Sequence, residues 1–204
     1  MRVKIITARN DNGGSPYRQY REEIVMADVF LSPSTQEYNE YYDGGGNEEY
    51  YMNIITDELI PYLEAMGISY GRNDPSGTFV DSIRKSNSGD YALHLALHSN
   101  ASPPQSAGKT RGVQVYYYPY STKGRRAAEI FAEKLREIYP LPEKVKTVPT
   151  TSLGEIVRTK APAVLIELAY HDNPDDAEWI RDNINETAQL LALGTKEILE
   201  TENE

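Results

Sequence analysis

The sequence predicts an α/β fold: a single domain with a mostly parallel, twisted sheet of about six strands and helices on both faces. Short apolar segments alternate along the chain with longer amphipathic ones, which is typical of folds where a helix follows each strand. Leucines alternate with other residues at positions 91–98, and aliphatic residues run through positions 163–167. With 204 residues, 39% of them hydrophobic, the chain suits one domain with one main core.

The first half of the chain has recognisable starts and stops. Residues 29–31 form a short apolar strand that ends at a Ser-Pro pair, because Pro is excluded from central strands. A long loop rich in Tyr, Glu and Gly follows, and loops of that length usually have a function. We expect a helix over residues 47–66, with Asn47 as its N-cap and Gly67 as its stop. The other elements of this half are a short strand, residues 68–70, and a helix, residues 78–88.

The second half repeats the alternation of strand and helix. In residues 91–98 the leucines lie on one face of the strand and both histidines on the other, because side chains alternate along a strand. Residues 112–118 form a strand after a loop rich in Pro, Gly and Ser, and residues 123–139 form an amphipathic helix. A buried strand at residues 163–168 precedes a C-terminal helix at residues 175–199.

We divide the chain into an N-terminal segment, residues 1–27, and the predicted α/β domain, residues 28–204. The first segment holds a possible strand at residues 3–7 and then a polar stretch that is typical of a loop or arm. No apolar signal-peptide region appears at the N-terminus, and no apolar run approaches the length of a membrane span. The sequence therefore predicts a soluble protein without membrane insertion, and it predicts no cellular address.

Composition limits the partners and the metal chemistry. The 31 acidic residues outnumber the 21 basic ones, and the net charge of −10 argues against nucleic acid and against anionic membrane surfaces as partners. The chain has no cysteine, so a transition metal would have to bind imidazole and carboxylate groups. Imidazole comes only from His94, His98 and His171.

Three polar side chains are expected to meet at one edge of the sheet. His98 and Glu167 stand at the carboxyl ends of two strands, and Glu49 lies in the first turn of the helix after the long loop. One imidazole with carboxylates and no thiol suits zinc in a hydrolytic site. Glu167 would then serve as a general base and later as a general acid. A strand-end Glu paired with Arg or Lys explains the same spacing equally well.

For each of the other two histidines, His94 and His171, the sequence allows a metal-binding role and a purely structural role. His94 and His98 are four residues apart, a spacing that suits a metal pair on a helix. On a strand they are about 13 Å apart at about 3.3 Å per residue, so His94 fits better as a core histidine or as a support for a metal ligand. His171 lies in a polar turn four residues after Glu167, where it is either a solvated loop residue or an additional metal ligand.

Several segments match, in order, the motifs of one enzyme family. Residues 90–101 end in Leu-His-Ser-Asn-Ala, residues 112–117 are Gly-Val-Gln-Val-Tyr-Tyr, and residues 162–167 are Pro-Ala-Val-Leu-Ile-Glu. At residues 47–53 a Glu precedes an Asn by four positions, a register that selects Glu49 rather than Glu48. Together these segments resemble the zinc-dependent N-acetylmuramoyl-L-alanine amidases of the amidase-3 type, which act on peptidoglycan.

The resemblance implies a reaction and roles for particular residues. The reaction is hydrolysis of the amide between the lactyl group of N-acetylmuramic acid and L-alanine, with one zinc ion per chain. His98 and Glu49 would bind zinc, and Glu167 would transfer protons. Asn100, Arg84 and Tyr170 match family positions and would contact the substrate. The partners would be peptidoglycan or muropeptide fragments, and the site of action would be the bacterial cell wall.

One family motif is replaced in this chain. The family's first zinc ligand is a His in a Asp-Pro-Gly-His-Gly-Gly turn, and residues 32–37 here are Ser-Pro-Ser-Thr-Gln-Glu. Thr35 takes the position of the His, with Gln36 beside it. An amide oxygen is a weaker zinc donor than imidazole, so zinc should bind weakly unless Gln36, Glu37 or His171 compensates. A module that binds peptidoglycan or a protein without cleaving it, and a metallopeptidase acting on free peptides, are the alternatives.

Overall fold

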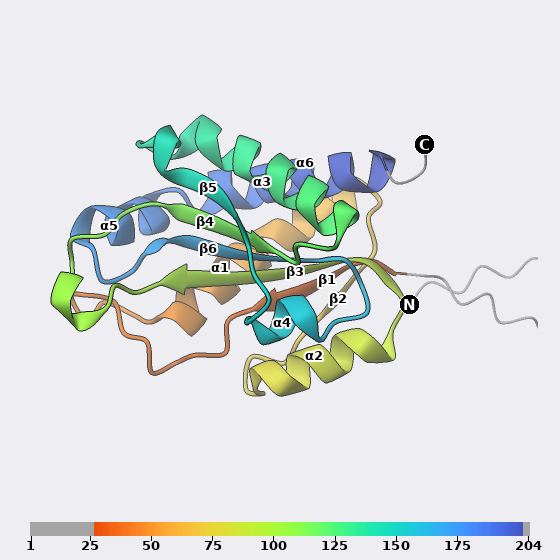
Figure 1. Ribbon diagram of the computed structural model, residues 1–204, viewed down its shortest axis with the longest axis horizontal. Helices are drawn as coiled ribbons and strands as arrows, with labels where there is room; N and C mark the ends of the chain where they lie inside the picture. The colour runs from red at the N-terminus through yellow and green to blue at the C-terminus, as the bar shows by residue number, and fades with distance from the viewer. Residues whose placement is uncertain (1–26, 202–204) are drawn as a thin grey trace, which may run out of the picture.

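The computed structural model describes residues 27–201, in which six strands form one sheet in the order β2-β1-β3-β6-β4-β5 (Figure 1). The strands are β1 (Ala27–Pro33), β2 (Tyr70–Arg72), β3 (Tyr91–Asn100), β4 (Val113–Tyr117), β5 (Val145–Pro149) and β6 (Ala163–Tyr170). The helices are α1 (Glu48–Ala65), α2 (Phe79–Ser88), α3 (Thr122–Ile138), α4 (Gly154–Val157), α5 (Pro174–Asp182) and α6 (Ile184–Thr201). Two short 3₁₀ turns, η1 (Pro104–Ser106) and η2 (Pro142–Lys144), complete the described part.

The sheet is mixed but mostly parallel, which confirms the predicted fold class. Strand β1 pairs in parallel with both β2 and β3, and β3 pairs in parallel with β6. Strands β4 and β5 are also parallel to each other. The pairing between β4 and β6 is antiparallel. The carboxyl ends of β1, β3 and β6 therefore lie at the same edge, where ligand sites of such sheets usually form.

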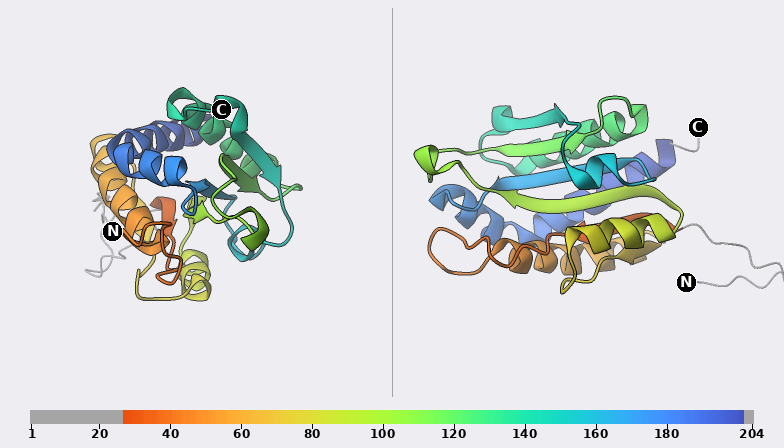
Figure 2. Two further views of the ribbon diagram at one scale, coloured as in Figure 1. Left: turned by 90° about the vertical axis from the view of Figure 1, so that its left-hand side faces the viewer. Right: turned by 60° about the horizontal axis from the view of Figure 1, so that its bottom comes forward.

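The two faces of the sheet are covered unequally. Helices α1, α3, α5 and α6 lie on one face, and the short helices α2 and α4 lie on the other (Figure 2). The main core is on the first face, where Leu93, Leu95 and Leu97 of β3 pack beside Val164 and Ile166 of β6. A smaller apolar cluster on the second face contains Ala96, Ala163 and Leu165. The lighter cover over the second face leaves room for a pocket.

Helix starts follow the capping residues in the sequence. The side chain of Asn47 accepts a hydrogen bond from the backbone N–H of Tyr50 and begins α1. Thr78 and Asp81 form a capping box at the start of α2. After α1 the backbone of Gly67 has a φ of 74°, a left-handed conformation that glycine adopts without strain.

Three features differ from the predicted elements. Strand β5 was not predicted, because as an edge strand it is only partly buried and lacks a clear alternation of apolar residues. Helix α4 has four residues, too few for a helical period to appear. The predicted C-terminal helix is two helices, since Asn183 ends α5 and its side-chain Nδ2 bonds to the carbonyl of Trp179.

The predicted strand at residues 3–7 and the arm that follows it lie outside the described residues. Within residues 27–201, none of the helices combines the length and the apolar character needed to cross a membrane.

Candidate active site

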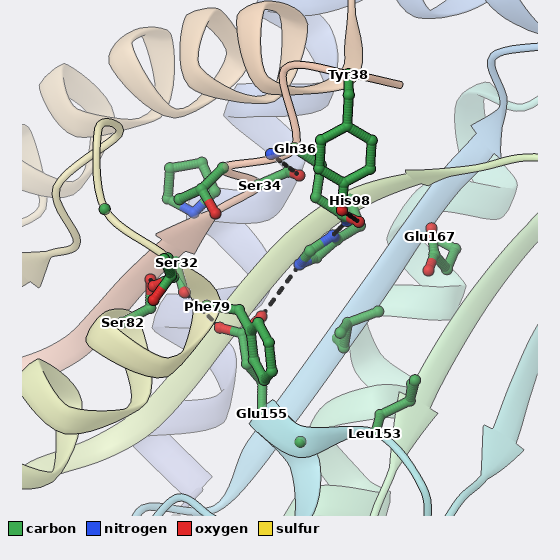
Figure 3. Close-up of a pocket in the computed structure, with 16 residues that line it drawn as sticks. Ser32, Ser34, Gln36, Tyr38, Phe79, Ser82, His98, Leu153, Glu155 and Glu167 are labelled. Atoms are coloured by element: carbon green, nitrogen blue, oxygen red, sulfur yellow. Dashed lines mark hydrogen bonds and ion pairs between the residues drawn. The ribbon is translucent and has the colours of Figure 1, made fainter. Parts of the chain in front are cut away.

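A pocket of about 560 Å³ opens at the carboxyl ends of β1, β3 and β6, on the sheet face that carries α2 and α4 (Figure 3). The turn after β1 forms one side, with Ser34, Thr35, Gln36 and Tyr38. The start of α2 and helix α4 form the opposite side. The polar residues on its floor and walls come from segments that are far apart in the sequence.

His98 and Glu167 are neighbours across two parallel strands. The register of β3 and β6 places the Cα atoms of these residues opposite each other, and alternation along each strand turns both side chains to the pocket face. Glu167 is half-buried, and its Oε2 atom is shielded from solvent without a hydrogen-bond partner. Burial raises the pKa of Glu167 to about 7, with opposing effects from the charges of His98 and Glu48.

The carboxylate beside Nδ1 of His98 belongs to Glu48. Its Oε1 lies 2.8 Å from Nδ1 of His98, and its Oε2 accepts a hydrogen bond of 2.6 Å from Nδ2 of Asn39. Glu48 is only 1% exposed. Burial alone would raise its pKa, but the hydrogen bond and charge of His98 hold that pKa below its ordinary value.

Glu49, which the four-residue spacing to Asn53 selects as a zinc ligand, is not in this position. Its Oε1 accepts a hydrogen bond of 3.1 Å from Nδ2 of Asn53 one turn later in α1. The buried stripe of α1 contains Met52, Ile55 and Leu59, and four residues before Met52 it reaches Glu48. The helical period thus places Glu48 on the buried side, and this signal was available in the sequence.

The side chain of Gln36 contacts both Glu48 and His98. Its Nε2 is 3.2 Å from Oε1 of Glu48 and 3.2 Å from Nδ1 of His98. Its Oε1 accepts a hydrogen bond of 2.9 Å from the hydroxyl of Tyr38, an exposed aromatic residue at the rim of the pocket. The side chain next to the replaced family ligand is therefore the one that contacts His98 and Glu48.

No sequence pattern marks Glu155 of α4, which lines the pocket on the side of α2 and α4. Its Oε2 is 3.1 Å from Nε2 of His98, and its Oε1 is 3.2 Å from Nε2 of His94 (Figure 3). Burial would raise the pKa of Glu155, but hydrogen bonds from His94 and His98 outweigh it and hold that pKa well below its ordinary value. Burial would likewise lower the pKa of His98, and its bonds to Glu155 and Glu48 raise it well above the ordinary value.

The remaining predicted site residues do not line the pocket. Arg84 is exposed on α2 and pairs with Asp81 at 2.8 Å, and Asn100 donates to Gln114 at 3.3 Å. Tyr170 is buried at the end of β6. Ala169 before it has a φ of 63°, and the pairing of β3 with β6 changes register beyond His98, so the strand no longer alternates there.

His171 follows this irregular strand end and is also held away from His98. Its Nδ1 lies 3.0 Å from the backbone carbonyl of Ser99 and 3.0 Å from the hydroxyl of the same residue. The ring stacks on Tyr41, with centroids 5.4 Å apart, and burial lowers its pKa. These contacts explain the histidine without a metal.

Among residues 27–201, no group of three His, Asp or Glu side chains is arranged to hold a metal ion. The donors that do converge are an imidazole nitrogen of His98, a carboxylate of Glu48 and the side-chain amide of Gln36. An imidazole and a carboxylate are ordinary zinc ligands, and a half-turn of the Gln36 amide would bring its oxygen, which now bonds to Tyr38, toward them. The residues present therefore offer two donors of the kinds that zinc takes, His98 and Glu48, and one weaker donor, Gln36.

Comparisons with known proteins agree with this architecture. The chain is 25% identical over 185 residues to the N-acetylmuramoyl-L-alanine amidase LytC of Bacillus subtilis, covering 87% of this chain and 36% of that protein. The chain thus spans about a third of the length of that curated relative.

Solved structures show the same fold. The catalytic domain of CwlV, an N-acetylmuramoyl-L-alanine amidase from Bacillus (Paenibacillus) polymyxa, superposes with a TM-score of 0.73 at 16% identity, covering 86% of this chain and 99% of that one. The amidase AmiC2 of Nostoc punctiforme gives 0.71 at 17% identity, with 84% and 96% covered. The family profile described as N-acetylmuramoyl-L-alanine amidase, Amidase_3, matches residues 34–197, and the chain belongs to this family.

Proposed function

We propose that this domain hydrolyses the amide that joins N-acetylmuramic acid to L-alanine in peptidoglycan, as a metal-dependent amidase. The observation that carries the proposal is Glu167. Its carboxylate has an unpaired, shielded oxygen and a pKa of about 7, and it borders the pocket beside His98. A group with such a pKa can accept and return a proton near neutral pH, which amide hydrolysis requires.

Zinc is the metal that the donor set and the family favour. His98, Glu48 and Gln36 would hold it, and Gln36, next to the Thr35 that stands in place of the family His, would be a weaker donor than imidazole. When bound, zinc would lower the pKa of a coordinated water to about 7 and polarise the substrate carbonyl. Because His98 and Glu48 share a hydrogen bond at 2.8 Å, zinc would have to displace the proton between them, so its affinity should fall at low pH.

The chain's own groups supply the rest of the reaction. Glu167 takes a proton from the attacking water and delivers it to the leaving amine of L-alanine. Phe79 and Leu153 give the pocket an apolar wall, and Tyr38 stands exposed at the rim. An aromatic side chain of this kind provides a flat face for a sugar ring or peptide, with a hydroxyl that can bond to it.

The test uses purified muropeptides and measures the free amino groups of L-alanine that appear with time. The parent protein with added zinc should release them, and a chelator should stop the release. Glu167→Gln should lower kcat by about 10²- to 10⁴-fold, the usual contribution of general acid–base catalysis. Glu178→Gln changes an exposed glutamate on α5 and should leave the rate unchanged. No release by the zinc-supplemented parent would contradict the proposal.

A second candidate function is binding of muropeptides without cleavage, which the loss of an imidazole donor favours, because Thr35 stands at the position of the family His. This function predicts no stoichiometric zinc in an elemental assay. It also predicts saturable muropeptide binding that Glu167→Gln leaves intact, with no amine released. Cleavage of stem peptides that lack muramic acid would instead indicate a metallopeptidase.

A further inference from the structure

A buried polar array at the wall of the pocket contains Glu155, His94, Ser32 and Ser86, which have no role in the proposed reaction. Glu155 is 4% exposed, and besides the two histidines it accepts a hydrogen bond of 2.5 Å from the hydroxyl of Ser32 in β1. His94 is fully buried, its Nδ1 lies 2.9 Å from the hydroxyl of Ser86 in α2, and its ring stacks on Phe30. The array therefore joins β1, β3, α2 and α4.

The chemistry of a carboxylate determines which nitrogens carry hydrogen. An ionised carboxylate only accepts hydrogen bonds, so Nε2 of His94 and Nε2 of His98 both donate to Glu155. With Nε2 of His98 committed as a donor, Nδ1 is the nitrogen that remains for the pocket. Nδ1 is also the atom that lies beside Glu48 and Gln36.

Glu155 is itself held from two sides. Its Oε1 accepts hydrogen bonds from Ser32 and His94, and its Oε2 accepts one from His98. Rotation of the carboxylate would break hydrogen bonds on both oxygens. Helix α4 is short, but it packs against α2, where Ile83 and Phe79 lie close to Gly154. A rigid acceptor behind an imidazole fixes the direction in which the opposite nitrogen points.

From this geometry we propose that Glu155 is a positioning residue, which orients the His98 ring so that Nδ1 faces Glu48 and Gln36 and binds the metal. His94 and Ser32 hold Glu155 in place. The inference rests on the proposed metal-dependent function. Fixing the two stronger donors in advance would offset the weaker binding of the third donor, Gln36.

The experiment measures the affinity of the full chain for zinc alone, by competition with a chromophoric chelator at one pH. Glu155→Gln keeps the size of the side chain but turns an NH₂ donor toward groups that are themselves donors. We expect zinc to bind about 10- to 100-fold more weakly to this variant, the usual effect of losing such a partner. The visible spectrum of the cobalt(II)-loaded variant should also differ from that of the parent, because the ligand geometry changes.

A matched control is Asp176→Asn. Asp176 is a fully buried carboxylate too, but it bonds to Arg111 and Tyr139, away from the pocket. Both variants should unfold at lower temperature than the parent, and only Glu155→Gln should lose zinc affinity. If Glu155→Gln fails to fold, His94→Gln keeps the carboxylate, removes one of its supports and should weaken zinc binding by a smaller factor.

Three results would overturn the inference. Zinc affinity of folded Glu155→Gln within about twofold of the parent would show that the carboxylate does not position His98. An equal loss of affinity in Asp176→Asn would show a general effect of destabilisation. A parent protein that binds no zinc would remove the proposed metal function itself, and this outcome is visible before any variant is compared.

Discussion

At the scale of single residues, Glu167 combines poor solvation with proximity to other charges. A carboxyl group that is harder to ionise in the folded protein binds protons more tightly there than in the unfolded chain. The pKa of Glu167 is about 7 in the fold, against 4.5 for an ordinary Glu. Its effect on folding is therefore favourable below pH 4.5 and is lost as the pH rises through about 7.

The raised pKa of Glu167 predicts how the thermal stability of the protein depends on pH, independently of catalysis. In metal-free protein, Glu167→Gln should unfold at a higher temperature than the parent at pH 8, and the advantage should shrink toward pH 4.5. The reason is that Gln does not ionise, so the cost of a shielded negative charge disappears. Thermal unfolding of both proteins across this pH range measures the effect. A parent whose advantage over the variant grows with pH would contradict it.

The residues of the site illustrate what the sequence could and could not predict. The cross-strand placement of His98 and Glu167 follows from strand periodicity and sheet topology, which local patterns carry. The choice between Glu48 and Glu49 depends on which side of α1 faces the sheet. The spacing to Asn53 selects Glu49, whereas the folded helix places Glu48 beside His98. Glu155 lies on a four-residue helix with no period, so only the folded chain brings it under His98.

At the scale of elements, the start of α1 determines where Glu48 lies, because Glu48 is the first residue of that helix. Asn47→Ala removes the bond to the N–H of Tyr50 and should cost about 1 kcal/mol of folding free energy. It should also weaken zinc binding, since fraying of the first turn moves the carboxylate of Glu48. Chemical unfolding and zinc competition measure the two effects.

Helix α3 offers the control for this prediction. Ser121 caps that helix in the same way, bonding to the N–H of Gly124, and α3 carries no residue that lines the pocket. Ser121→Ala should cost a similar free energy, about 1 kcal/mol, and leave zinc affinity unchanged. If both variants weaken zinc equally, the cap of α1 has no special role in placing Glu48.

Local sequence patterns predict some elements of this fold and miss others. Helices α1, α2 and α3 have N-caps, and α1 and α3 also have long apolar stripes, so the sequence predicted all three to within a few residues. Strand β5 has neither, because it pairs only with β4 and is partly exposed. Its place in the sheet follows from pairing across the chain, which no local pattern encodes.

At the scale of the whole molecule, the residues of the main core and the residues of the pocket lie on opposite faces of the sheet. One face packs against four helices and forms the main core, while the other carries the pocket and the array around Glu155. Adjacent residues of one strand therefore serve different purposes. In β6, Ile166 is fully buried in the main core, and Leu165 lines the pocket.

This separation predicts opposite consequences for two neighbouring substitutions. Ile166→Ala should lower the free energy of unfolding by about 2–5 kcal/mol, because it leaves a cavity among core side chains that cannot close around it. Its kcat at a temperature where it stays folded should remain near that of the parent. Leu165→Ala should cost less stability, because the lost side chain opens onto a pocket that water can enter, and it should mainly raise KM. Equilibrium unfolding and muropeptide kinetics on both variants test the idea, and equal changes in stability and KM for the two would show that the faces are not independent.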